Sequence, residues 1–171
     1  KIRTIELLSA LDMLWLVILV IMQTLTAMKM AMKNKLLEQR AYTDAHTGLP
    51  NKGACEALLR DQDTIVEPKV CIMFDLNNLK TANDTMGHSA GDRLIMDFAR
   101  LLRSVIPDKD FVGGYGGDEF MAVIYHTGKT EIEELLQSLC REKDRLNSNE
   151  AQIPIDYACG WAISTDEGTY T

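Results

Sequence analysis

The fold is decided by the stretch DFVGGYGGDEFMAVIY, which occupies residues 110–125. Two apolar runs within it are separated by Gly116-Gly117-Asp118. A Gly-Gly-Asp junction between apolar runs indicates a β-hairpin, because glycine tolerates the backbone angles of a tight turn. The glycines also leave the turn backbone open to a ligand. The stretch therefore predicts a hairpin that carries Asp118 and Glu119 at its tip.

The rest of the chain shows helical and strand patterns around this hairpin. An apolar run stops at Asp75, which is typical of a strand buried on both faces. Other segments have apolar residues every three to four positions, as in amphipathic helices. The expected elements are helices at 52–60, 89–105 and 130–146 and strands at 70–74, 110–115, 119–125 and 153–163. This order predicts an α/β sandwich with a mixed, partly antiparallel central sheet.

Composition and charge narrow the class of protein. The chain has 171 residues, of which 46% are hydrophobic, and only 4 Cys, 11 Gly and 4 Pro, which excludes a disordered, disulfide-rich or fibrous protein. The net charge of −7 argues against a nucleic-acid partner, because such proteins are normally basic. The four cysteines show no metal-ligand spacing and are expected to be buried free thiols.

The charge is distributed unevenly along the chain. Residues 1–40 hold six Lys or Arg against three Asp or Glu, which leaves 12 against 22 for the remainder. A basic apolar stretch followed by an acidic one indicates a domain boundary. We therefore expect an N-terminal hydrophobic helix at 1–41 and a globular domain at 42–171.

The N-terminal part contains a long apolar segment. Residues 13–28 hold no charged residue, and a cluster of basic residues begins at Lys29. A membrane-spanning helix needs about 20 apolar residues and carries positive charge on its cytoplasmic side, so residues 7–28 fit a membrane anchor. Apolar residues also recur at the spacing of a dimerising two-stranded coiled coil. Both interpretations stay open, and both predict one long helix.

Acidic residues lie where two apolar strands meet polar sequence. Asp75 closes the first strand, and Asp118 and Glu119 lie at the hairpin tip. If the hairpin pairs with the first strand, these three carboxylates converge at one edge of the sheet. Mg²⁺ binds oxygen-rich sites of this kind, and two such ions activate an attacking hydroxyl and stabilise a leaving pyrophosphate. The residues alone fit equally well a structural interpretation, in which Asp118 caps a turn and Asp75 ends a strand.

Five ordered motifs give the sequence a family resemblance. They are DAHTGLPNK at 44–52, FDLNNLK at 74–80, ND at 83–84, GHSAGD at 87–92 and GGDEF at 116–120. The last is the signature for which the GGDEF diguanylate cyclase family is named, and together the motifs resemble that family over residues 42–165. Five motifs in the family's order are far more specific than the signature alone.

The resemblance implies a palm-like domain of the nucleotidyl cyclase type that condenses two GTP into cyclic di-GMP and pyrophosphate. Each half of a symmetric homodimer would hold one GTP, and the product would serve as a bacterial second messenger. A membrane anchor would place the domain on the cytoplasmic side of the bacterial inner membrane, whereas a coiled coil would make the protein cytoplasmic. The alternative is a catalytically weak or inactive module that binds GTP or cyclic di-GMP as a signalling domain.

The resemblance also implies roles for the acidic residues. Two Mg²⁺ per GTP site, or Mn²⁺ in their place, would be held by three carboxylates and the backbone carbonyl of Leu76. Those carboxylates are Asp75, Asp118 and Glu119. Asp118 and Glu119 would be the catalytic residues, with Glu119 as a metal ligand or as the group that activates the 3′-hydroxyl.

Substrate contacts are implied for a second set of residues. Asn83 and Asp92 would read the guanine edge, since an amide and a carboxylate together match the donors and acceptors of a purine. The phosphate and pocket contacts are assigned to Lys80, to the backbone amides of Asn78 and Leu79, and to His88.

Some positions depart from the family's pattern. They are His46, Lys52, Asn77 and Gly114, where the family usually has Leu, Arg, Asp and Arg. The first two changes predict altered packing or salt bridging, and the last two predict modest activity. Asp110 ends the family's RxxD product-inhibition motif without its arginine, which predicts weak feedback inhibition. The chain is also expected to lack the family's last helix.

Overall fold

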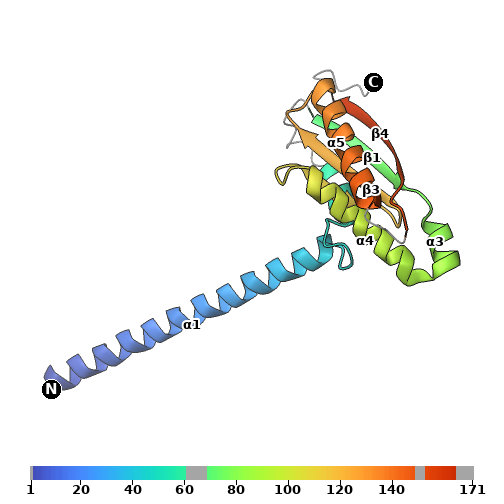
Figure 1. Cartoon of the computed structure of the whole chain (residues 1–171). Coiled ribbons are helices and arrows are strands. Elements are labelled where there is room, and N and C mark those ends of the chain that lie inside the picture. The colour runs from blue at the N-terminus through green and yellow to red at the C-terminus, as the bar shows by residue number, and fades with distance from the viewer. Residues whose placement is uncertain (1, 61–68, 149–152, 165–171) are drawn as a thin grey trace. The chain divides into compact units, whose positions relative to one another are not determined.

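The computed structural model describes residues 2–60, 69–148 and 153–164. The helices are α1 (Ile2–Tyr42), α2 (Lys52–Arg60), α3 (Leu79–Met86), α4 (His88–Val105) and α5 (Lys129–Ser148), and the strands are β1 (Lys69–Leu76), β2 (Phe111–Gly114), β3 (Glu119–Tyr125) and β4 (Tyr157–Ser164) (Figure 1). Contacts between residues divide the chain into two compact units, residues 1–41 and 42–171.

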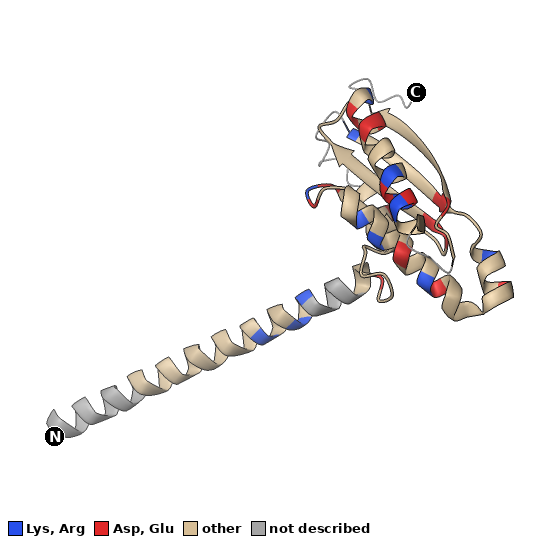
Figure 2. Ribbon diagram, in the orientation of Figure 1, with Lys and Arg blue, Asp and Glu red and all other residues tan. Residues whose placement is uncertain are grey.

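The long N-terminal helix that the sequence predicts is present as α1. Its side chains from residue 13 to residue 35 are exposed. Figure 2 shows that the described part of this helix carries no charged side chain before the lysines that begin at Lys29. Met13–Lys35 has a mean hydropathy of 1.8 and is long and apolar enough, by length and composition, to cross a membrane.

The sheet has the strand order β2-β3-β1-β4, with β1 at its centre between β3 and β4. The hairpin and the α/β sandwich are confirmed, but the sequence predicts a mixed sheet, whereas every pairing among the described strands is antiparallel. The reason lies in the hairpin. Its second arm, β3, runs antiparallel to β1 and pairs with it. Its first arm, β2, runs in the same direction as β1 but pairs with β3.

Helix α3 is absent from the elements that apolar patterning predicts. It is a short helix that buries a single small residue, Ala82. A helix with so little buried surface leaves almost no apolar periodicity in the sequence. Gly87, with φ 85°, separates α3 from α4 and allows the two helices to pack against each other.

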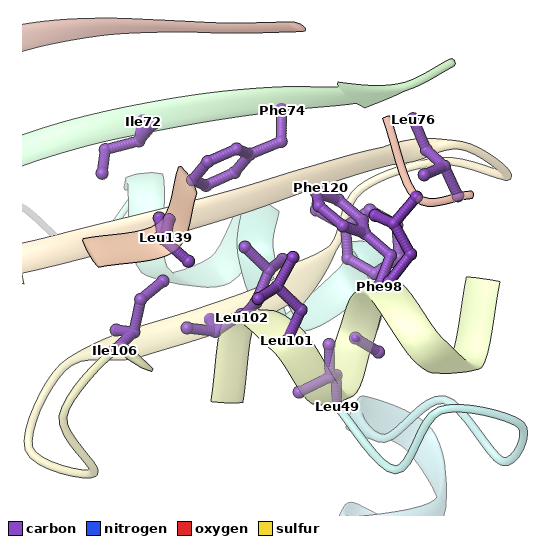
Figure 3. Close-up of a cluster of buried hydrophobic side chains, with 14 of the residues drawn as sticks. Leu49, Ile72, Phe74, Leu76, Phe98, Leu101, Leu102, Ile106, Phe120 and Leu139 are labelled. Carbon is purple, nitrogen blue, oxygen red and sulfur yellow. The ribbon is translucent and has the colours of Figure 1, made fainter. Parts of the chain in front are cut away.

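The main core lies on one face of β1 and β3, under α4 and α5 (Figure 3). The ring of Phe98 in α4 lies 5.0 Å from that of Phe120 in β3 and 6.1 Å from that of Phe74 in β1. Buried residues alternate with more exposed ones along β1, and Asp75 and Met73 are exposed. The prediction that this strand is buried on both faces is therefore wrong, because its second face is only partly covered.

Helix α2 covers part of the second face. Cys55 of α2 is fully buried in a small cluster that includes Met121 of β3. The amide of Gly114 donates a hydrogen bond of 2.8 Å to the Pro50 carbonyl. Gly113 approaches so closely that an added Cβ would lie 2.6 Å from Cys55 Sγ and 3.0 Å from the Pro50 oxygen. These contacts seat the hairpin on the first motif and on α2.

All four cysteines are free, but only Cys55 is buried. Burial raises the pKa of the Cys55 thiol to about 11. Cys140 and Cys159 are exposed, so the prediction of buried thiols is wrong for these two. Cys140 lies on the solvent side of α5 and Cys159 lies in the edge strand β4.

Replacing Gly113 with alanine is expected to destabilise the domain by about 1–3 kcal/mol, because the added methyl group meets a buried sulfur and fixed backbone. Gly114→Ala is the matched control, since nothing lies within 4 Å of its added Cβ. Its stability should change by less than about 0.5 kcal/mol. Urea unfolding of both variants measures the difference, and equal stabilities would contradict the close approach of β2 to α2.

Candidate active site

The hairpin tip is the four-residue loop at 115–118, which is closed by backbone hydrogen bonds. The amides of Tyr115 and Gly116 donate to the Glu119 carbonyl at 2.8 and 3.0 Å. The amide of Leu76 donates to the Asp118 carbonyl at 2.9 Å, which ties the tip to the end of β1. An added Cβ at Gly116 would lie 2.7 Å from Glu119 Oε2. The glycine therefore leaves room for the Glu119 carboxylate.

Asp75 and Glu119 face each other across the β1–β3 pair. They are direct partners in the antiparallel register, so their side chains leave the sheet on the same face. Both residues are exposed. Within the described part of the chain, neither carboxylate has a hydrogen bond or an ion pair. Like charges directly opposite each other are unfavourable in a sheet, so a cation bound between them would relieve the repulsion.

A cavity of about 240 Å³ opens beside these two carboxylates. Its other lining residues are Met73, Phe74, Ala158, Cys159 and Gly160. Among residues 2–60, 69–148 and 153–164, no three His, Cys, Asp or Glu side chains gather closely enough to hold a metal ion. The structure thus brings Asp75 and Glu119 together but does not join the Asp118 side chain to them in a three-ligand cluster.

This donor set fits Mg²⁺ nonetheless. Mg²⁺ keeps several waters and is commonly bound through one or two carboxylates together with substrate phosphates. Asp75 and Glu119 supply two exposed carboxylates beside open space, and the Leu76 carbonyl belongs to the same strand end. A metal ligand from the substrate would complete such a site.

The turn from β1 into α3 positions the expected phosphate contacts. Asn78 has a left-handed backbone, with φ 64° and ψ 9°, a conformation that asparagine tolerates better than most residues. The Ala82 amide donates to the Asn78 carbonyl at 2.9 Å and closes the first helical turn. Leu79 and the exposed Lys80 lie in this turn, where backbone amides without helical partners attract anions.

The expected guanine contacts meet between α3 and α4. An added Cβ at Gly91 would collide with the side-chain amide of Asn83, so Asn83 rests against the residue that precedes Asp92. Asn83 is half-buried and Asp92 is exposed. His88 begins α4 four positions before Asp92, so both lie on one side of the helix. The structure therefore places the Asn83 side chain against α4 and His88 one helical turn before Asp92, and no hydrogen bond or ion pair joins the three side chains within the described residues.

A second cavity, of about 450 Å³, connects Asp92 with the hairpin tip. The first motif forms its other wall. His46 Nε2 lies 3.2 Å from the Asp92 carbonyl oxygen, and Lys52 Nζ lies 5.2 Å from the centre of the Tyr115 ring. Sequence reasoning assigned His46 and Lys52 to packing or salt bridging and missed their place beside the site. The available signal was their membership of the first motif.

Asp44 organises the loop that carries His46. Its Oδ1 accepts hydrogen bonds from the amides of His46 and Thr47, at 3.1 and 2.7 Å, and from the Thr47 hydroxyl at 2.8 Å. Partial burial is the largest single influence and would raise the pKa of Asp44. The hydrogen bonds together outweigh it and lower that pKa below its ordinary value. The loop is therefore held by a carboxylate that is ionised at neutral pH.

Asp110 is used inside the fold. It is 6% exposed, and its Oδ1 accepts a hydrogen bond of 3.0 Å from the Tyr125 amide. Its Oδ2 has no partner in the described part of the chain. Burial, followed by the nearby Asp110 charge, raises the pKa of the Tyr125 hydroxyl. This carboxylate joins the outer ends of the two hairpin arms, and weak feedback inhibition stays a prediction.

Residues 41–171 match the sequence profile of the family described as "Diguanylate cyclase, GGDEF domain". The chain belongs to this family. The GGDEF domain matched in this way includes all five motifs and every residue of the candidate site.

Two curated relatives and one solved structure illustrate the likeness. The chain is 30% identical over 142 residues to the signaling protein YkoW of Bacillus subtilis, covering 79% of this chain and 18% of that protein. It is 28% identical over 145 residues to the probable diguanylate cyclase DgcC of Escherichia coli K12, covering 80% and 38%. The chain therefore spans well under half the length of these relatives. The GGDEF domain of DgcB from Caulobacter crescentus, in complex with c-di-GMP, has a TM-score of 0.65 at 26% identity, covering 74% of this chain and 80% of that one.

Gly91→Ala tests whether the GGDEF domain positions Asn83 for a nucleotide. The added methyl group would collide with the Asn83 amide and lie 3.0 Å from Leu79 Cδ1, so its overpacking, which costs about 1–3 kcal/mol, opposes the helix-propensity gain of about 1 kcal/mol of alanine over glycine. We expect GTP affinity to fall about tenfold, because a lost hydrogen bond costs about 1–1.5 kcal/mol. Asn83→Ala should show the same loss. Titration with GTP measures both, and unchanged affinity in Gly91→Ala beside a loss in Asn83→Ala would contradict the positioning.

Proposed function

We propose that this GGDEF domain is a diguanylate cyclase that joins two GTP molecules into cyclic di-GMP and releases pyrophosphate. The observation that carries the proposal is the pairing of Asp75 with Glu119 at an open end of the sheet. Two uncompensated carboxylates at this place are suited to a divalent cation. Family membership and the likeness to DgcC support the same reaction.

The reaction makes two phosphodiester bonds. In each step the 3′-hydroxyl of one GTP attacks the α-phosphate of the other, the bond to the β-phosphate oxygen breaks, and the hydroxyl proton passes to a base. Two bound Mg²⁺, or Mn²⁺, would lower the pKa of the attacking hydroxyl and offset the charge of the leaving pyrophosphate. Asp75, Asp118, Glu119 and the Leu76 carbonyl would hold them. Glu119, exposed at the hairpin tip, would act either as one of these metal ligands or as the base that takes the proton of the 3′-hydroxyl.

The neighbouring residues would orient the nucleotide. Asn83 and Asp92 would bind the guanine edge, and His88 would line the same pocket. The phosphates would lie against the first turn of α3, at Lys80 and at the amides of Asn78 and Leu79. In this arrangement the guanine would be bound by α3 and α4, and the reacting phosphate would lie between the hairpin and β1.

Catalysis would require a homodimer. The described residues supply one Asp75–Glu119 pair, and Asn83 lies against Gly91, the residue before Asp92, so one copy of the chain would offer residues for one GTP. A second copy related by a two-fold axis would bring a second GTP with the opposite orientation. Each 3′-hydroxyl would then face the α-phosphate of the other nucleotide.

An inactive module that binds GTP or cyclic di-GMP is the second candidate. One observation favours it: no ready three-ligand metal cluster is formed within the described residues. Gly114, in place of the family's arginine, also leaves the hairpin without a charged side chain next to the signature.

The Glu119→Gln variant tests whether the Glu119 carboxylate takes part in cyclic di-GMP formation, as the cyclase requires and the inactive module does not. It removes the charge from the hairpin tip at nearly constant size, so formation of cyclic di-GMP from GTP and Mg²⁺ should fall by about 100-fold or more. The melting temperature should not fall, because the side chain is exposed. Glu133→Gln is the matched control, since Glu133 lies on the exposed side of α5 with only a 3.9 Å pair to Lys129.

The wild-type chain itself gives the decisive comparison. A folded wild-type dimer that binds GTP but makes no cyclic di-GMP would refute the cyclase and support the inactive module. Full activity in Glu119→Gln would refute the role of that carboxylate.

We further propose that α1 anchors the protein in the bacterial inner membrane, with the GGDEF domain in the cytoplasm. The apolar side chains of residues 13–28 are distributed around the whole helix, whereas a coiled coil requires only one apolar stripe. The lysines that begin at Lys29 fit a cytoplasmic flank. A dimerising coiled coil is the alternative.

Leu19→Lys tests the anchor in the full chain expressed in bacteria. A lysine at the centre of a span costs about 2.5–3.5 kcal/mol, so the variant should move from washed membranes toward the soluble fraction. Met32→Lys, within the basic flank, should stay with the membranes. A wild-type chain that is soluble and dimeric would refute the anchor and support the coiled coil.

A further inference from the structure

Asn77, which the sequence marks as a departure from the family, has a specific partner far along the chain. Its amide donates to the Asp156 carbonyl at 2.9 Å. Its side-chain Nδ2 donates to Asp156 Oδ2, also at 2.9 Å, across 79 positions of sequence. Lys143 Nζ lies 3.9 Å from Asp156 Oδ1 on the other side. The backbone carbonyl and the side-chain carboxylate of Asp156 therefore each accept a hydrogen bond from Asn77.

The two hydrogen bonds act at the point where β1 becomes the turn into α3. The preceding residue, Leu76, donates its amide to the Asp118 carbonyl at the hairpin tip. The following residue, Asn78, has the left-handed backbone that turns the chain into α3. The chain is thus held by the hairpin on one side and by Asp156, just before β4, on the other. The hydrogen bonds that hold Asn77 therefore also set the direction in which the β1–α3 turn leaves the sheet.

We propose that Asn77 and Asp156 form a positioning pair that sets the β1–α3 turn for the phosphates of GTP. This proposal rests on the proposed function for the identity of the nucleotide. The pair also explains why asparagine stands at position 77. A carboxylate there would face Asp156 Oδ2 at hydrogen-bond distance with no proton to share, and like charges in contact repel. Asn77 supplies the hydrogen-bond donor, and Asp156 supplies the acceptor.

The neighbourhood of Asp156 supports this division of roles. Lys143 Nζ lies beside Asp156 Oδ1, the carboxylate oxygen that does not bind Asn77. The same Nζ lies 5.7 Å from the centre of the Tyr157 ring. Lys143 is mostly buried, with 22% of its side chain exposed, while Asp156 is 52% exposed. The same lysine is 3.9 Å from Asp144, whereas the described hydrogen bonds of Asn77 with an acidic residue both go to Asp156. Asp144 therefore offers a control for the loss of a negative charge near Lys143.

The experiment compares four variants of the full chain with wild type: Asn77→Asp, Asp156→Asn, the double exchange N77D/D156N, and Asp144→Asn. Two quantities are measured on each variant. The first is the KM for GTP and the kcat of cyclic di-GMP formation. The second is the hydrogen–deuterium exchange rate of the backbone amides of residues 76–82, which needs no turnover and no metal.

We expect Asn77→Asp to raise KM for GTP about fivefold, with a smaller change in kcat, and to speed exchange across the turn, because the like-charge contact opens it. The double exchange should return both quantities to within about twofold of wild type, since the donor and acceptor are then simply reversed. Asp156→Asn should change little, because an amide oxygen still accepts, and Asp144→Asn should match wild type.

Two results would overturn the proposal. One is an Asn77→Asp variant with wild-type exchange across residues 76–82. The other is a double exchange that behaves no better than Asn77→Asp. A wild-type chain without cyclase activity would refute the proposed function alone, and the exchange rates would then decide the positioning pair by themselves.

Discussion

The register between β1 and β3 is the constraint on which the site depends. It places Asp75 opposite Glu119, and it is fixed by the apolar residues of β1 that alternate toward α4 and α5. A slip of one residue would turn Phe74 outward and drive Asp75 into the core, at the cost of both burial and an unpaired charge. The aromatic contacts between Phe74, Phe98 and Phe120 therefore hold the carboxylates in place as surely as they hold the sheet.

The local patterns of the sequence predict much of this arrangement, and the reason is physical. A Gly-Gly-Asp junction between apolar runs can close only as a tight turn, so the hairpin and the position of Glu119 follow from neighbours in sequence. The amphipathic periodicity of α4 and α5 predicts both helices to within a few residues. Apolar periodicity does not predict helix α3, because this helix buries only one alanine. Its place in the chain is indicated only by the motifs around it.

What the sequence does not predict is the set of contacts made across long separations. His46 and Asp92 meet through the fold, and so do Asn77 and Asp156. No periodicity or turn chemistry relates these residues, because the members of each pair lie far apart in sequence and meet only in the folded domain. Local sequence patterns also do not predict that β3, and not β2, pairs with β1. This pairing makes the described sheet wholly antiparallel. From the sequence, position 77 has lost a charge relative to the family, whereas the fold places the Asp156 carboxylate, which lies just before β4, beside it.

The central place of β1 has a consequence for how the domain assembles. Both of its neighbours come later in the chain, and β4 is the last described element. During synthesis, β1 therefore emerges from the ribosome long before either partner, with two unpaired edges and an apolar face. Pairings of such high sequence separation slow folding, and the described sheet is complete only when both later strands have been made. A nascent chain that has not yet reached β4 holds all five motifs but lacks the strand that pairs with the second edge of β1.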